Sequence, residues 1–274
     1  MGKDPLTLKN VWTTLDGLKL LYRASAVPTP AGAPTLIHVH GFAISGRYLL
    51  PTAARLAPFY PTYVPDLPGF GRSERPRHPL GIPELAESLA RFMDHVGVEH
   101  AVLLGNSLGG PIIADFLDAH PDRIDAAILC SPAGGLNNRP FVKGVAQLLL
   151  DGVREPLGLA PIALTDYARY GIIPSIDLFR SLIHYPTLQR LAELILPTLV
   201  VFGSRDPLVS EKRVREHAAE LPHVTAVALD GAAHAINFSH PDQLANVVRA
   251  FMEKREIVDD PSFAGRVRVI QVAP

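Results

Sequence analysis

The stretch that decides the fold is AVLLGNSLGGPIIADF, residues 101–116. Its apolar start at 101–104 is typical of a buried strand, and the apolar spacing after the motif is typical of a helix. Between them lies GNSLG at 105–109, a G-x-S-x-G motif in the strand–turn–helix context that it requires. So tight a turn leaves no room for a Cβ two residues either side of the serine, which explains the two glycines. We therefore expect Ser107 to stand above a strand end as a nucleophile, beside a helix N-terminus that favours negative charge.

Strand-like and helix-like segments alternate along much of the chain. Further apolar runs typical of buried strands occur at 35–40, 62–65, 126–130, 197–202 and 224–229. Helical periodicity lies between several of them, as at 83–96 and 211–221. Such alternation predicts an α/β fold with a mostly parallel sheet, because parallel strands need long, usually helical, crossovers.

The two ends of the chain carry a different pattern. Residues 8–14 and 18–23 alternate around Asp16-Gly17, which predicts a two-residue β-hairpin. Near the other end, RVRVIQV at 266–272 also alternates like a strand. From the sequence alone, this late strand is compatible with a sheet edge, with pairing to a neighbouring subunit, or with a frayed tail.

One long interval, from residue 133 to about 196, has no convincing strand. It has helical patterns near 141–153, 162–170 and 176–183. We expect these helices to form a cap, or lid, beyond the carboxyl ends of the strands; the alternative is that they pack on the flank of the sheet. The predicted organisation is a core at 1–132 and 191–256, a helical cap at 133–190, and an extension at 257–274.

Composition excludes several kinds of partner. The net charge is −1 and the isoelectric point is near 6.8, so no electrostatic attraction to nucleic acid or to an anionic membrane is expected. No apolar stretch approaches the roughly 18 residues that span a bilayer, and MGKDPLTLKN has no apolar segment of a signal peptide. The single cysteine, Cys130, rules out an intramolecular disulfide. We expect a cytoplasmic monomer or homodimer without nucleic-acid or membrane partners.

A serine nucleophile needs a base to take its proton. Of the eleven histidines, His234 lies in a loop directly after the strand at 224–229, with the small residues Gly231, Ala232 and Ala233 before it. This position brings it to the same sheet edge as Ser107. Other histidines nearby fall within or beside helices: His217, His223 and His240.

The base in turn needs an acid that orients it. Asp206 follows the strand at 197–202, so it too belongs at the carboxyl edge of the sheet. Its rival, Asp230, closes the next strand and is better placed to serve the turn. A role of Asp206 in capping the helix that starts near Ser210 is disfavoured by the four-residue gap. The predicted catalytic residues are therefore Ser107, Asp206 and His234.

With these residues in hand, the chain resembles the α/β-hydrolases over residues 8 to 254. Four separate motifs carry the resemblance, in the family's order: HGF at 40–42, DLPGFGRS at 66–73, the serine motif at 105–109, and GSRD at 203–206 followed by His234. The resemblance implies a mostly parallel eight-stranded sheet with a helical cap after the sixth strand. It implies a scaffold role for the 66–73 loop.

The resemblance also implies an oxyanion hole. Its two donors would be the backbone N–H groups of Leu108, after the nucleophile, and of Phe42, after the His-Gly pair. His40 is implied to brace that loop rather than to act in catalysis, and His38, inside a strand, is expected to be a core histidine with satisfied ring nitrogens. We expect neither a metal nor a cofactor.

Serine at the elbow indicates the reaction class. Haloalkane dehalogenases and most epoxide hydrolases of this fold carry aspartate there, so Ser107 points to attack on a carbonyl. We expect hydrolysis of a carboxylic ester by water through an acyl-enzyme. One alternative is C–C bond hydrolysis of meta-cleavage products, disfavoured by Ala235 and by the loop after Gly41. Another is a receptor-like binding protein without catalysis; lactone, thioester, amide and acyl-transfer chemistry also stay open.

Substrate choice is expected to lie in the cap. Its apolar side chains suggest a pocket for small-to-medium apolar esters. The predicted lining residues are Leu149, Tyr167, Tyr170, Ile173 and Phe179.

Overall fold

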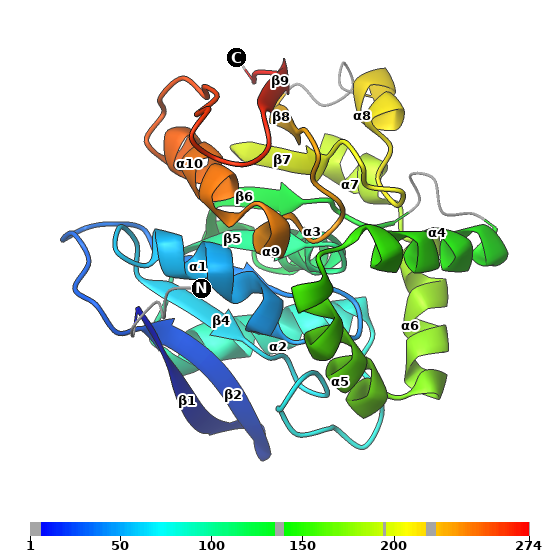
Figure 1. The fold of residues 1–274 in the computed structure, drawn as a ribbon. Helices are drawn as coiled ribbons and strands as arrows, with labels where there is room; N and C mark the ends of the chain where they lie inside the picture. The colour runs from blue at the N-terminus through cyan, green and yellow to red at the C-terminus, as the bar shows by residue number, and fades with distance from the viewer. Residues whose placement is uncertain (1–6, 135–139, 194–195, 218–222, 274) are drawn as a thin grey trace.

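A nine-stranded sheet runs through the part of the chain that the computed structural model describes, residues 7–134, 140–193, 196–217 and 223–273 (Figure 1). The strand order is β1-β2-β4-β3-β5-β6-β7-β8-β9. The strands are β1 (Leu8–Leu15), β2 (Leu18–Ser25), β3 (Leu36–Val39), β4 (Thr62–Pro65), β5 (Ala101–Asn106), β6 (Ile124–Cys130), β7 (Thr198–Gly203), β8 (Val224–Leu229) and β9 (Val267–Gln271). The six central strands are parallel, whereas β1, β2 and β9 pair antiparallel at the edges. The expected α/β fold is confirmed, with one strand more than the eight implied by the resemblance.

Helices cover both faces of the sheet. On one face α2 (Ile82–His95) packs beside α3 (Gly109–Ala119), and on the other α1 (Leu50–Leu56) packs beside α10 (Pro241–Met252). Two further helices are α8 (Glu211–His217) and α9 (Ile236–Ser239), and three 3₁₀ turns are η1 (Gly46–Leu49), η2 (Pro121–Arg123) and η3 (Leu157–Leu159). The predicted continuation of α8 to residue 221 lies outside the described residues. Strands β5, β7 and β8 are buried along their whole length, as expected of parallel strands between two helical layers.

The predicted hairpin is confirmed at the N-terminal edge. β1 pairs with β2 so that Leu15 faces Leu18 across a two-residue turn. Both turn residues have positive φ, 52° at Asp16 and 79° at Gly17. This is the left-handed combination that a type I′ turn requires.

Between β6 and β7 lie α4 (Phe141–Arg154), η3, α5 (Ala160–Tyr170), α6 (Ile172–His184) and α7 (Thr187–Ala192). We call the segment from α4 to α6 the cap. Its contacts place it over the carboxyl ends of the strands, since Asp166 of α5 accepts a hydrogen bond from the Ser45 N–H (2.9 Å) after β3, and the Gln147 side chain of α4 donates to the Pro207 carbonyl (2.7 Å) after β7. In Figure 1 these helices gather at one side of the sheet.

The late strand adds to the sheet edge. β9 pairs antiparallel with β8, and the Arg268 side chain donates hydrogen bonds to Asp230 (2.7 Å) and Glu211 (2.8 Å). Of the three possibilities left open by the sequence, the structure therefore selects the edge strand. Among the described residues, no helix has the length and the apolar character needed to cross a membrane.

Candidate active site

Ser107 occupies a strained turn between β5 and α3. Its φ is 55°, a left-handed conformation that non-glycine residues rarely adopt. The turn is held because the Ser107 N–H donates to the Cys130 carbonyl (3.0 Å) and the Ser107 carbonyl accepts from Gly110 N–H (3.0 Å). A Cβ on Gly105 would lie 2.6 Å from the main chain of Gly109. The elbow therefore forms only with glycine beside it, as the motif predicts.

His234 and Asp206 meet at the carboxyl ends of β7 and β8. Nδ1 of His234 donates a hydrogen bond to Oδ2 of Asp206 at 2.8 Å. The other carboxylate oxygen, Oδ1, accepts from the N–H groups of Leu208 (2.7 Å) and Val209 (3.1 Å). Asp206 is thus fully engaged and its side chain is fully buried, which fixes the ring orientation and places the imidazole proton on Nδ1.

The second ring nitrogen, Nε2 of His234, is buried and has no hydrogen-bond partner within the described residues. The Ser107 hydroxyl is therefore not bonded to it in this conformation. The residue directly before Ser107 is in contact with the histidine, because the side chain of Asn106 donates to the His234 carbonyl at 3.2 Å. Nε2 is the free basic nitrogen that a serine nucleophile needs.

The rival residues have other partners. Asp230 accepts its hydrogen bond from Arg268, and His240 bonds the Ser239 hydroxyl (2.9 Å). The His40 ring donates to the Gly41 carbonyl (3.0 Å) and accepts from Leu67 N–H (3.1 Å), so it joins two loops as a brace.

His38 corrects one expectation. It is fully buried as predicted, but neither ring nitrogen has a hydrogen-bond partner among the described residues. Burial without a hydrogen-bond partner disfavours the charged ring, so the pKa of His38 is lowered to about 3 and the ring stays neutral.

Two backbone donors are free where the oxyanion hole is expected. In the described part of the chain, neither the Phe42 N–H nor the Leu108 N–H donates a hydrogen bond to another protein group. The adjacent Gly41 N–H donates to the hydroxyl of Tyr48 (2.9 Å), which in turn donates to Oδ1 of Asn106 (2.5 Å). The sequence analysis did not predict a role for Tyr48 or Asn106. The only signal in the sequence was that Asn106, a polar residue, directly precedes the serine.

The cavity beside Ser107 is small, about 20 Å³. Of the five predicted cap residues, Phe179 lines it and Tyr167 packs on Phe42, with ring centroids 5.9 Å apart. Tyr170 instead stacks on Phe70 at 4.6 Å. Leu149 and Ile173 are 69% and 76% exposed, so the structure does not bring them to the cavity.

Other apolar residues line this cavity in their place. They are Leu148, Leu182, Ile183 and Leu208. Leu148 differs from the predicted Leu149 by one position, about 100° around a helix. The run LLL at 148–150 could not show which of its residues faces the core.

Two acidic residues of the cap reach the histidine loop, and sequence reasoning missed both. Oδ1 of Asp151 accepts from the His234 N–H (3.3 Å), and Oε1 of Glu155 accepts from Ala235 N–H (2.6 Å). Burial raises the pKa of Asp151 to about 6 and that of Glu155 to about 7. Burial lowers the pKa of His234, but the charge and hydrogen bond of Asp206, aided by Asp151 and Glu155, outweigh it and raise the pKa to about 9.

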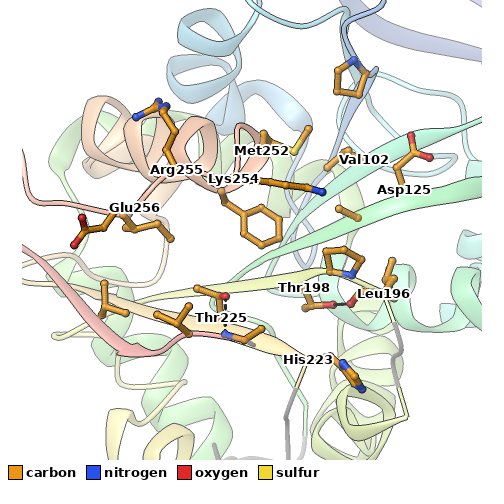
Figure 2. Close-up of a pocket in the computed structure, with 18 residues that line it drawn as sticks. Val102, Asp125, Leu196, Thr198, His223, Thr225, Met252, Lys254, Arg255 and Glu256 are labelled. Atoms are coloured by element: carbon orange, nitrogen blue, oxygen red, sulfur yellow. Dashed lines mark hydrogen bonds between the residues drawn. The ribbon is translucent and has the colours of Figure 1, made fainter.

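A second cavity, of about 900 Å³, lies at the amino ends of the parallel strands, and Figure 2 shows the residues that line it. Val102, Thr198 and Thr225, near the amino ends of β5, β7 and β8, line it together with residues that follow α10. It contains His223, but no serine or cysteine among its described lining residues. None of Ser107, Asp206 and His234 is among the residues that line it.

Comparison with known proteins agrees with this architecture. The sequence model of a family described as "alpha/beta hydrolase fold" matches residues 34–165. A pimeloyl-[acyl-carrier protein] methyl ester esterase from Pectobacterium atrosepticum is 29% identical over 249 residues, which cover 81% of this chain and 96% of the relative. The esterase of the same name from Xanthomonas campestris pv. campestris is 28% identical over 254 residues, covering 80% and 95%.

Solved structures share the fold. A carboxylesterase from Bacillus subtilis superposes with a TM-score of 0.71 at 25% identity, covering 90% of this chain and 92% of the other. A bacterial membrane phospholipase A superposes with a TM-score of 0.77 at 24% identity, covering 91% and 87%. The chain therefore has the α/β-hydrolase fold. Several of the proteins that it resembles are named as esterases.

Proposed function

We propose that this chain is a carboxylic ester hydrolase that works through a Ser107–His234–Asp206 triad and an acyl-enzyme. One observation carries the proposal: a histidine bonded to a buried carboxylate at 2.8 Å, with its other nitrogen free, beside a serine held at φ 55°. The relatives named as esterases support the same reaction class.

In the first half of the reaction, Nε2 of His234 takes the proton of the Ser107 hydroxyl as Oγ attacks the ester carbonyl. Charge then develops on the carbonyl oxygen, and the N–H groups of Phe42 and Leu108 stabilise it. Each such donor contributes about 3 kcal/mol to the barrier reduction. Asp206 stabilises the imidazolium, which returns the proton to the departing alcohol.

In the second half, His234 acts on water. Nε2 removes a proton from a water molecule that attacks the acyl carbon, the same two N–H groups hold the oxyanion, and His234 protonates Ser107 again. The products are the carboxylic acid and the free serine. The cycle requires only ester, water and the chain's own residues.

For the substrate, we propose small-to-medium apolar esters, beginning with methyl esters because two relatives are named for such a bond. The wall beside Ser107 is apolar, formed by residues such as Phe42, Leu148 and Phe179. A cavity of about 20 Å³ has room for about one water molecule, so acyl groups enter only when lining side chains or the cap move. We propose that the 133–190 insertion, which contains the cap, admits them.

The direct test combines turnover with labelling. Hydrolysis of p-nitrophenyl esters from acetate to laurate should peak at short or medium chains and should vanish in Ser107→Ala. A fluorophosphonate should add to Ser107 in the wild type alone, as read by mass spectrometry of peptides. Labelling elsewhere, or full activity in Ser107→Ala, would overturn the triad. Tight binding of an ester without turnover would favour the receptor-like reading, and cleavage of meta-cleavage products in preference to esters would favour C–C hydrolysis.

A further inference from the structure

The cap holds the main chain of the catalytic histidine. Oδ1 of Asp151 accepts from the His234 N–H at 3.3 Å, and Oε1 of Glu155 accepts from the next N–H, that of Ala235, at 2.6 Å. The Asn106 side chain, next to the elbow serine, donates to the His234 carbonyl at 3.2 Å. The residue that carries the imidazole is therefore held between the elbow and α4.

Apolar packing accounts for part of the docking of α4, because Phe141, Val145 and Leu148 pack against the core. It does not account for Asp151, a carboxylate that is buried on the same helix while Val142, Leu149 and Val153 are exposed. Burying a carboxylate costs free energy unless partners compensate. The burial of Asp151 thus points to a role at the site.

The surroundings of the two carboxylates concentrate negative charge. The negative charges are those of Asp151, Glu155 and Asp206. The positively charged groups that act on Asp151 are His234 and Arg154. Arg154 is also tied to the loop before Asp206, because its guanidinium donates to the Arg205 carbonyl (2.7 Å).

The remaining titratable neighbours are phenols. Tyr48 interacts with Glu155, and Tyr167 with Asp151; burial raises the pKa of both hydroxyls, so they stay neutral. Oε2 of Glu155 is buried and has no hydrogen-bond partner within the described residues. The imidazole is therefore the group that gains most from this negative charge.

We propose that Asp151 and Glu155 are positioning residues of the catalytic centre: they hold the His234 loop from the cap and stabilise the imidazolium form of His234 by their charge. The inference rests on the proposed function of His234 as the base. It makes the cap part of the catalytic machinery, since a shift of α4 would loosen the histidine as well as open the cavity.

The test separates charge from position. Asp151→Asn and Glu155→Gln each keep an oxygen that can accept the backbone N–H, but they remove the charge. At separations within the site and an effective dielectric constant near 20, loss of one charge should lower the pKa of His234 by about one unit. Asp177→Asn is the matched control, because it makes the same change at an exposed position of α6.

The readout is an NMR titration of the His234 ring in ¹⁵N-histidine-labelled protein, assigned with His234→Asn. The acid limb of the pH profile of kcat/KM should move to lower pH by the same amount, and kcat on the alkaline plateau should fall about tenfold. Asp151→Ala loses the acceptor as well as the charge, so its kcat should fall further than that of Asp151→Asn. A His234 pKa in either folded variant that matches both the wild type and Asp177→Asn would overturn the inference.

This outcome is separable from failure of the proposed function. The NMR titration needs no turnover, so it reports on the carboxylates even if Ser107 does not act as a nucleophile. Conversely, Ser107→Ala could lose activity while the His234 pKa stays unchanged in Asp151→Asn and Glu155→Gln. That result would uphold the esterase and reject the positioning role.

Discussion

The hydroxyl of Tyr48 lies 2.5 Å from Oδ1 of Asn106 and donates a hydrogen bond to it. Tyr48 also accepts from the N–H of Gly41, which precedes Phe42 of the proposed oxyanion hole. Asn106 directly precedes Ser107 and its amide donates to the carbonyls of Cys130 and His234. One phenol thus joins the loop after β3 to the elbow and, through Asn106, to the histidine loop.

Tyr48→Phe tests this connection. The change leaves the buried Gly41 N–H and the Asn106 carbonyl oxygen without a partner, which should cost about 1–3 kcal/mol of unfolding free energy. Because the oxyanion donors and the nucleophile lose their common anchor, kcat should fall about tenfold while KM changes little. Urea denaturation and steady-state kinetics on a short p-nitrophenyl ester measure the two effects.

Tyr22→Phe is the control for that experiment. Tyr22 lies in β2, and its hydroxyl donates no hydrogen bond within the described part of the chain. Stability and kcat should both stay close to the wild type. An equal loss of kcat in the two variants would contradict the positioning role of Tyr48.

The pH dependence of catalysis follows from His234. Its carboxylate neighbours raise its pKa to about 9, and only the neutral ring can accept the Ser107 proton. kcat/KM should therefore rise about tenfold per pH unit below pH 9 and become level above it. The measurement is kcat/KM for a non-ionising ester from pH 6 to 10, corrected for spontaneous hydrolysis and normalised by phosphonate titration of active sites.

Asp206→Asn should change that profile in a defined direction. Without the main stabilising charge, the acid limb should move to lower pH, while the maximal rate should fall by about 10⁴ because the ring loses its oriented tautomer. An acid limb that remains near pH 9 in this variant would show that another group governs the titration.

Replacement of two glycines by alanine should change the stability of the protein in opposite directions. A Cβ on Gly109 would lie 2.5 Å from the Val39 carbonyl oxygen, a main-chain atom that cannot easily move away. Gly109→Ala should therefore lose several kcal/mol of stability or fail to fold. Gly152 lies in α4 with nothing within 4 Å of an added Cβ, so Gly152→Ala should gain about 0.5–1 kcal/mol from helix propensity. Thermal unfolding of both variants measures the contrast; a loss of stability in Gly152→Ala would contradict this account of α4.

Local chemistry made much of the fold predictable. The Asp16-Gly17 pair dictates its own turn, because few residues tolerate positive φ at both positions. Apolar runs bounded by turn residues show where buried parallel strands lie. Because Ser107, Asp206 and His234 each follow such a strand, they were expected at the same edge of the sheet. The order of the strands in the sheet comes from the structure, because it depends on pairing between segments far apart in the chain.

The cap was less predictable for a physical reason. A helix that is apolar around much of its circumference does not reveal its buried side, so Leu148 faces the cavity while Leu149 faces solvent. Likewise, an acidic residue on a helix is usually predicted to face solvent. Only the position of α4 in the structure shows that Asp151 and Glu155 contact the histidine loop.

By itself, the sequence determined the α/β fold, the serine elbow and the residues expected to act there, because these depend on backbone geometry and on short-range residue spacing. The tertiary structure alone decided three further features: which cap side chains line the cavity, that Tyr48 and Asn106 join the active-site loops, and that two cap carboxylates face His234. Each of these depends on contacts between segments far apart in the chain, and those contacts form only when the helices and loops have packed.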